Sequence, residues 1–335
     1  MWPRRKRAVA GPRTAAPDDA LYATPRRVAR AEDCRFYHSM EIPGHGVVSG
    51  DWDLRGREDS YLGGVDLAGR RVLEIGPASG FVTYHMESRG AEVVAIELGS
   101  DDEWDMVPHA GLDLERIRVE RVPVMERLRN GFWFAHERFG STARVHHGPA
   151  YDLPPALGRF DLAVMASVLL HTRDPLRVME ACARRADNLV ITDLHVPELD
   201  GMPVARFAPE VGSDNWHTWW HLSPELVTRL LAIMGFHELE VSYHEQTHIG
   251  GGREIPMPLF TVVASRASAP SDRHRSGAQP SVDASASVAQ PSCSRTRAGS
   301  ALTTRSYESS TKSHTSRSGM LPSSVIVFQW RLLRW

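Results

Sequence analysis

The sequence has little cysteine and no long apolar run. Its three cysteines, Cys34, Cys182 and Cys293, form no CxxC pair, which argues against a disulfide scaffold and a structural zinc site. No stretch of 18 apolar residues occurs, and the basic residues 1–13 are not followed by an apolar segment of signal-peptide length. We therefore expect a cytoplasmic protein without a membrane span.

The negative charge is concentrated in the middle of the chain. The formal net charge of the 335 residues is −2, but residues 1–30 carry +6 and residues 266–335 carry +7, which leaves −15 for residues 31–265. An acidic stretch repels the phosphate backbone of nucleic acids unless a local basic patch compensates. The charge pattern therefore favours a small-molecule substrate.

Neither end of the chain shows the periodicity of a folded segment. Residues 1–30 are rich in Arg, Pro and Ala, and residues 266–335 hold 17 serines in 70 positions. We expect a disordered basic arm and a disordered Ser/Arg-rich tail. Because the composition changes abruptly after residue 264, one hypothesis is that the tail is a frameshifted or read-through extension.

The middle of the chain alternates short β-branched runs with amphipathic stretches, which is typical of an α/β fold with a mostly parallel sheet. Seven strands are expected, in a Rossmann-like sheet with helices on both faces. Only a loop, Glu245–Met257, separates the last two strands, so the closing strand should be antiparallel. The expected strands are Arg71–Ile75, Glu92–Glu97, Ala143–His147, Phe160–Met165, Asn188–Thr192, Glu238–Tyr243 and Leu259–Ala264.

The connection between the second and third strands is much longer than usual for this fold class. It shows helical periodicity at Leu112–Val119 and again at Val122–Phe134. We interpret residues 101–142 as a helical lid inserted into a domain of residues 70–265. Residues 31–69 are expected to form an N-terminal cap over the active site.

A turn of small residues follows the first strand. Gly76 to Gly80 separate this strand from a helix at Phe81–Arg89, so backbone amides can approach a ligand at the helix start. The dinucleotide fingerprint would need glycine at Ala78 and Phe81, which disfavours NAD or FAD. Glu97 ends the adjacent strand, where its carboxylate can accept hydrogen bonds from both ribose hydroxyls of a nucleotide-like ligand.

This order of elements resembles the class I S-adenosylmethionine (SAM) dependent methyltransferases over about residues 35–265. The resemblance implies SAM as cofactor, with Glu97 as the ribose-binding acid. Because Pro149 stands where many members have an Asp that binds the adenine amino group, this hydrogen bond comes from Asp152, from the backbone of Ala150 and Tyr151, or is absent. The cofactor-binding residues implied in this way are Trp52, Glu74, Gly76, Pro77, Ala78, Ser79, Gly80, Glu97, Leu98, Ala150, Tyr151, Asp152, Ala166 and Ser167.

Three further segments look like the branch that includes the bacterial tRNA wobble-uridine carboxymethyl-transferring enzymes. These are Phe36–His38 with Trp52, Val168–Pro175, and Asn215–Trp220. In the tRNA enzymes a Tyr precedes the His of the second segment and holds the carboxylate of carboxy-SAM. Leu170 stands there and cannot donate a hydrogen bond, so the resemblance implies plain SAM as donor and makes tRNA the less favoured substrate.

His171 is the first candidate for catalysis. It follows the fourth strand, and the ordinary pKa of histidine, near 6.5, suits a general base at neutral pH. The alternative is that it braces the helix that follows. Tyr37 and His38 are weaker candidates, because only the resemblance places them over the site.

Aromatic residues and histidines leave further alternatives open. Five tryptophans form either an aromatic wall around the substrate or ordinary packing: Trp104, Trp133, Trp216, Trp219 and Trp220. The pairs His217 with His221 and His244 with His248 lack a carboxylate or cysteine cluster, so we assign no metal. The predicted reaction is methyl transfer to an oxygen or nitrogen of a small molecule, the alternatives being a tRNA-modifying transferase and a non-catalytic SAM-binding protein.

Overall fold

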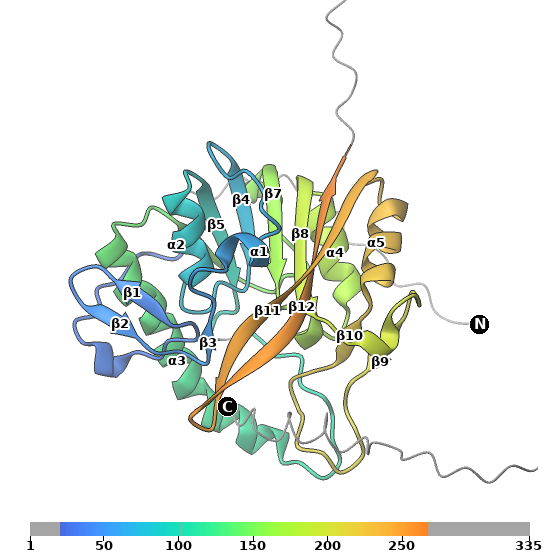
Figure 1. The fold of residues 1–335 in the computed structure, drawn as a ribbon. Coiled ribbons are helices and arrows are strands. Elements are labelled where there is room, and N and C mark those ends of the chain that lie inside the picture. Colours follow the sequence, from blue (N-terminus) through green and yellow to red (C-terminus); the bar gives the residue numbers. More distant parts are fainter. Residues whose placement is uncertain (1–20, 101, 267–335) are drawn as a thin grey trace, which may run out of the picture. The chain divides into compact units, whose positions relative to one another are not determined.

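A mixed eight-stranded sheet forms the centre of the computed structural model, which describes residues 21–100 and 102–266 (Figure 1). The strand order is β3-β11-β12-β8-β7-β4-β5-β6. The strands are β3 (Trp52–Asp53), β4 (Arg71–Ile75), β5 (Glu92–Glu97), β6 (Arg144–His147), β7 (Phe160–Ala166), β8 (Ala186–Leu194), β11 (Glu238–Gly250) and β12 (Arg253–Ser265). Two small antiparallel pairs accompany them, β1 (Met40–Ile42) with β2 (Gly46–Val48) and β9 (Ala205–Phe207) with β10 (Trp220–Leu222).

The five strands from β4 to β8 are parallel, and β12 and β11 close the sheet in antiparallel register. The seven expected strands are thus confirmed, as is the antiparallel closing strand. From β4 the chain proceeds outward through β5 to β6, and from β7 it proceeds the other way to β8. In open α/β sheets the ligand crevice lies where the strand order reverses, at the carboxyl ends of the strands. Here that place is the end of β4 and β7.

Helices cover both faces of the sheet, as the sequence predicts. The side chains of β5 alternate between the faces: Val94 and Ile96 belong to one core cluster with α4 (Pro175–Ala183) and α5 (Pro224–Ile233), and Ala95 belongs to another. The second cluster contains residues of α2 (Phe81–Ser88) and α3 (Leu114–Phe139). The remaining helices are short: α1 (Glu58–Tyr61) and the 3-10 turns η2 (Ala31–Asp33), η3 (Pro155–Leu157), η4 (Leu169–His171) and η5 (Pro197–Leu199).

The expectation of a loop at Glu245–Met257 is wrong. Strands β11 and β12 pair without interruption from Glu238↔Ser265 to Gly250↔Arg253, so a long hairpin replaces the loop. Its two-residue turn, Gly251–Gly252, has φ of 58° and 74°, which glycine adopts at no steric cost and which matches the twist of a hairpin. The hairpin also binds β3 at Thr247↔Asp53 and His248↔Trp52, and the expected cap thereby contributes the eighth strand.

The two stretches of helical periodicity within residues 101–142 belong to a single helix, α3. Helix α3 runs for 26 residues with Pro123 inside it, and it begins at Asp113, whose side chain accepts a hydrogen bond from the amide of Arg116. Its buried residues, Gly131–Ala135, all lie in its second half, where they pack in the second core cluster. The second half therefore covers the sheet, and only the first half corresponds to an insertion.

The expected disordered arm is wrong over its last ten residues. The amide of Ala23 donates to the carbonyl of Val145 at 2.7 Å, and Arg26 forms an ion pair of 2.7 Å with Glu126 of α3. These contacts fix residues 21–30 along β6 and α3. Residues 1–20 and the Ser/Arg-rich tail of residues 267–335 lie outside the described residues. Over the described range, no helix combines the length and the apolar character needed to cross a membrane.

Candidate functional site

The turn between β4 and α2 has the backbone conformation of a ligand cradle. Gly76, Ala78 and Gly80 all have positive φ, of 74°, 50° and 89°. At Ala78 this is uncommon for a residue with a side chain, and such outliers concentrate at functional sites. A Cβ at Gly76 would lie 3.3 Å from the side chain of Val168, so the turn after β4 and the one after β7 approach each other closely.

Glu97, the expected ribose-binding acid, reaches the glycine turn. Its Oε1 accepts a hydrogen bond of 2.8 Å from the amide of Leu98, and its carboxylate also accepts one from the backbone of Ala78. The carbonyl of Glu97 accepts from the amide of Gly148 at 3.0 Å. Burial raises the pKa of Glu97, while the two amides and Arg129 act against the rise. The carboxylate of Glu97 thus meets the glycine turn at the carboxyl ends of β4 and β5.

Glu74 lies inside the fold beneath the same turn. It is 3% exposed, and its Oε2 accepts a hydrogen bond of 2.5 Å from the Oγ1 of Thr83. Burial raises its pKa to about 8, with the nearby Glu97 adding to the rise. Glu74 is therefore largely protonated at neutral pH and joins the end of β4 to α2.

The segment before the sheet is fastened directly to the turn. The amide of Tyr37 donates to the Oγ of the fully buried Ser79 at 2.9 Å, and the amide of Trp52 donates to the carbonyl of Tyr37 at 3.0 Å. The ring of His38 lies 5.7 Å from that of Phe81 at the start of α2. The structure therefore brings Tyr37, His38 and Trp52 to the predicted site.

Burial keeps Tyr37 and His38 uncharged. It raises the pKa of Tyr37 and lowers that of His38 to about 3. The Nδ1 of His38 is buried and has no hydrogen-bond partner among the described residues. The indole of Trp52 packs edge-on against the ring of His248, 4.9 Å away. These groups can position a substrate, but neither ring carries a charge at neutral pH.

A second uncommon backbone conformation follows β7. Ser167 has φ of 53°, its amide donates to the carbonyl of Thr192 at 2.7 Å, and its Oγ accepts a hydrogen bond of 3.1 Å from the hydroxyl of Tyr61. Ala166 ends the strand just before it. Ala78 and Ser167, the two non-glycine residues with positive φ within residues 21–100 and 102–266, thus follow adjacent strands, where the strand order reverses.

The segment after β6 holds the residues that are expected to serve the adenine. Asp152 forms an ion pair of 2.6 Å with Arg177, and its side chain is 74% exposed. The hydroxyl of Tyr151 donates to Asp105 and accepts from the amide of Arg173 at 3.0 Å. These contacts orient both side chains, and the expectation that Asp152 or the backbone of Ala150 and Tyr151 serves the adenine stays a prediction.

His171 is held in one tautomer by the backbone. Its Nδ1 lies 2.8 Å from the carbonyl oxygen of His217. A carbonyl only accepts, so Nδ1 carries the hydrogen and Nε2 keeps the lone pair when the ring is neutral. Burial lowers the pKa of His171, which keeps the ring neutral at pH 7. The geometry therefore gives His171 the protonation state of a general base.

The five tryptophans differ in their surroundings. Trp104 and Trp216 are half-buried and stack with ring centroids 6.4 Å apart, next to His217, and whether they contact a substrate stays a prediction. Trp133 is 5% exposed within the core cluster of α3. Trp219 and Trp220 are structural, because the Nε1 of Trp219 donates to the carbonyl of Asp105 at 2.6 Å and that of Trp220 to the carbonyl of Arg173 at 3.1 Å.

Several residues at the site were missed by sequence reasoning. Asp193 at the end of β8 is 2% exposed, and burial raises its pKa to about 7. Its Oδ1 accepts from the amide of Leu194 at 2.8 Å, and its carboxyl also accepts from the backbone of Leu170 in the turn that carries His171. Arg121 of α3 lies 5.6 Å over the ring of Trp216. An acid that ends a buried strand was a usable signal for Asp193, whereas a helical arginine offered none.

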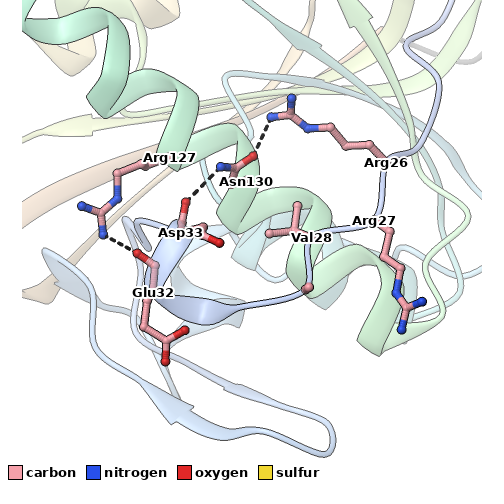
Figure 2. Close-up of a pocket in the computed structure, with 8 residues that line it drawn as sticks. Arg26, Arg27, Val28, Glu32, Asp33, Arg127 and Asn130 are labelled. Atoms are coloured by element: carbon pink, nitrogen blue, oxygen red, sulfur yellow. Dashed lines mark hydrogen bonds between the residues drawn. The ribbon is translucent and has the colours of Figure 1, made fainter.

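A surface hollow lies elsewhere. It has a volume of about 570 Å³ and is formed by residues 26–29, Glu32 and Asp33 together with Arg127 and Asn130 of α3 (Figure 2). Its polar groups bind one another: Asn130 accepts from Arg26 at 2.8 Å and donates to the carbonyl of Asp33 at 2.9 Å. None of the predicted site residues lines it. In residues 21–100 and 102–266, no group of three or more metal-ligating side chains is found either.

Comparisons with known proteins give partial matches. No protein-family profile matches the chain. It is 27% identical over 116 residues to the ubiquinone biosynthesis O-methyltransferase of Psychrobacter cryohalolentis, and the aligned segment covers 35% of this chain and 36% of that protein. It is 28% identical over 183 residues to the tRNA U34 carboxymethyltransferase of Geobacter sp. (strain M21), which covers 52% of this chain and 46% of that protein. The chain thus spans less than half the length of these curated relatives.

Solved structures with a similar fold are also distant. The N-terminal domain of EvdMO1 with SAH bound has a TM-score of 0.46 and 21% identity, over 69% of this chain and 90% of that one. Magnesium protoporphyrin IX methyltransferase from Synechocystis PCC 6803 with bound SAH has a TM-score of 0.38 and 15% identity, over 62% of this chain and 82% of that one.

Proposed function

We propose that this chain, whose fold and sequence similarities are those of class I SAM-dependent methyltransferases, transfers a methyl group from SAM to an oxygen or nitrogen of a small molecule. The observation that carries the proposal is the meeting of Glu97 with the glycine turn at Ala78, in the crevice where the strand order reverses.

The residues present fit SAM. The turn from Gly76 to Gly80 consists of small residues and Pro77, so a ligand can approach its backbone closely, and the carboxylate of Glu97 can accept hydrogen bonds from two ribose hydroxyls. Leu98 supports Glu97 through its amide, and Ser79 holds Tyr37 next to the turn. When bound, SAM supplies an electrophilic methyl group on a sulfonium.

The part assigned to His171 is to take a proton from the acceptor. Its neutral ring, with Nδ1–H donated to the carbonyl of His217, presents Nε2 as the base. A hydroxyl acceptor needs this step, because an alcohol or phenol is a poor nucleophile while it keeps its proton. An amine that is already basic needs only positioning.

Plain SAM rather than a carboxylated donor fits the turn before His171. Leu170 is 5% exposed, and its carbonyl accepts from the amide of Trp219 at 2.8 Å. Its apolar side chain offers no donor to a carboxylate. A tRNA-modifying transferase is the second candidate, supported by the 183-residue match to a tRNA U34 carboxymethyltransferase. A SAM-binding protein without catalysis is the third.

One experiment separates the three. The purified chain is incubated with methyl-labelled SAM and, in parallel, with a cellular extract fraction of small molecules and with total tRNA. Label in the small-molecule fraction that depends on His171 supports the proposal. Label confined to tRNA supports the second candidate. SAM binding without transfer in either fraction supports the third.

A further inference from the structure

A closed ring of hydrogen bonds fastens the end of helix α1 to the turn after β7. The hydroxyl of Tyr61, the last residue of α1, donates to the Oγ of Ser167 at 3.1 Å. The amide of Ser167 donates to the carbonyl of Thr192 at 2.7 Å, and the Oγ1 of Thr192 donates to the carbonyl of Tyr61 at 2.7 Å. The ring therefore joins the cap, the turn after β7 and strand β8.

The ring is buried and continues into β12 and β11. Tyr61 is 5% exposed, Thr192 1% and Thr261 0%. The Oγ1 atoms of Thr192 and Thr261 lie 2.9 Å apart, and the Nε2 of His244 lies 2.9 Å from the Oγ1 of Thr261. The amide nitrogen of Gln246 donates to the Nδ1 of His244 at 3.3 Å. A buried network of this kind favours one arrangement of the groups that it joins, so it holds the cap in place on the sheet.

Ser167 needs such support because of its backbone conformation. Its φ of 53° lies in the left-handed region, which costs free energy in a residue with a side chain. The ring engages both its amide and its Oγ. Burial raises the pKa of Tyr61, so the Tyr61 hydroxyl keeps its hydrogen and donates it. Ser167 therefore retains its own hydroxyl hydrogen for another acceptor.

The strand order places Ser167 at the opposite end of the site from the expected adenine segment. In the order β7-β4-β5-β6, Ser167 follows β7, Glu97 ends β5 and Ala150 lies after β6. SAM is built in the order adenine, ribose, sulfonium and amino acid. With its ribose at Glu97 and its adenine beyond β5, its amino-acid part extends towards β4 and β7. That part offers a carboxylate, which can accept a hydrogen bond from a serine hydroxyl.

We propose that Tyr61 is a positioning residue of the cofactor site, whose hydroxyl holds Ser167 in the conformation that meets the amino-acid part of SAM. This inference rests on the proposed function and adds a residue of the cap to the same site. The cap then contributes to cofactor affinity through Ser167, in addition to covering the site.

The test uses two ligands that share adenine, ribose and sulfur. S-adenosylhomocysteine (SAH) carries the amino-acid part, and 5′-methylthioadenosine lacks it. Each is titrated by calorimetry into the full chain. The variants are Tyr61→Phe, which removes only the hydroxyl, Ser167→Ala, which removes its Oγ, and the double variant. Tyr243, which is 54% exposed, supplies the control Tyr243→Phe.

We expect Tyr61→Phe to bind SAH about three- to tenfold more weakly, because one buried hydrogen bond no longer supports Ser167. Its affinity for 5′-methylthioadenosine should stay unchanged. Ser167→Ala should lose at least as much affinity for SAH. The double variant should lose no more than Ser167→Ala, because the two side chains act as one unit. Tyr243→Phe should bind both ligands as the unmodified chain does.

The outcomes keep the two proposals apart. Absence of SAH binding to the unmodified chain contradicts the proposed function. If the unmodified chain binds SAH, an unchanged affinity in Tyr61→Phe overturns the inference alone, as do equal losses for the two ligands. Additive losses in the double variant overturn it as well, because Tyr61 would then act independently of Ser167.

Discussion

The Nδ1 of His171 donates a hydrogen bond of 2.8 Å to the carbonyl oxygen of His217. The bond crosses 46 residues of sequence and decides the tautomer of the proposed base. Because the partner is a backbone carbonyl, substitution of the His217 side chain leaves this bond available. The general-base interpretation and the brace interpretation of His171 are therefore compatible, since one nitrogen braces while the other stays available.

Replacing His171 tests the base directly. We expect His171→Ala to lower kcat by about 10²–10⁴-fold for a hydroxyl acceptor, while SAM affinity stays unchanged. Because burial lowers the pKa of His171, kcat of the unmodified chain should be constant at pH 7 and above and should fall only below the ordinary histidine pKa. The exposed His237→Gln serves as control. A kcat that is insensitive to His171→Ala would leave His171 only a structural role.

The raised pKa of Glu74 leads us to expect that the free energy of unfolding depends on pH. Its pKa is about 8 in the folded state and 4.5 ordinarily, so the folded chain binds more protons between these values and stability falls as the pH rises through that window. The loss for a fully buried group is of the order of 4 kcal/mol. Glu74→Gln, which mimics the protonated form, should flatten the pH dependence of the free energy of unfolding from pH 5 to 8. The exposed Glu240→Gln should not, and an unchanged slope in Glu74→Gln would refute the assignment.

Gly131 is the position at which α3 closely approaches the backbone of Arg35. A Cβ at Gly131 would overlap the carbonyl oxygen of Arg35. Gly131→Ala should therefore destabilise the fold by about 2 kcal/mol or more, although alanine favours helix by about 1 kcal/mol. Gly111→Ala, whose Cβ meets no atom within 4 Å, is the matched control. Equal melting temperatures for the two variants would contradict the close approach.

Asp193 is a positioning residue for the turn of His171. Its carboxyl accepts from the backbone of Leu170 and Leu194. We expect Asp193→Leu to lower kcat by about tenfold or more, because the amides lose a buried acceptor worth about 1–3 kcal/mol. Asp193→Asn keeps one oxygen acceptor and should recover most of the activity. An Asn variant as impaired as the Leu variant would mean that the charge itself is required, and the positioning role would be wrong.

The sequence predicted the parallel strands and the glycine turn because their signals are local. A β-branched run, a small-residue turn and an acid at the next strand end need no tertiary information. The arms of the β11–β12 hairpin were missed because their polar residues pair with each other and with β3 rather than with a helix-covered core. The ion pair of Asp152 with Arg177 could not be predicted, because it depends on side-chain direction, which spacing along the chain does not fix.

The contact of Arg121 with Trp216 could not be predicted from the sequence for a different reason. Arg121 lies in the first half of α3, whereas the buried residues of this helix lie in its second half. Its contact with Trp216 joins residues that are 95 positions apart in the sequence. Only the folded arrangement brings α3, the cap and the segment before β10 together. His171 could be proposed as a base from its place after a strand, but its tautomer could not be predicted, because the tautomer depends on the carbonyl of His217 in the same distant segment.

Calorimetric titration of the chain with SAM and with S-adenosylhomocysteine tests the central claim, with Glu97→Ala and the control Glu92→Ala on the same strand. Glu92 lies at the opposite end of β5, paired with Arg71 and Arg144. We predict that both ligands bind the unmodified chain and Glu92→Ala alike, and that Glu97→Ala loses about tenfold or more of the affinity, because two ribose hydroxyls lose a charged acceptor. Absence of binding to the unmodified chain, or equal binding by Glu97→Ala, would contradict the account.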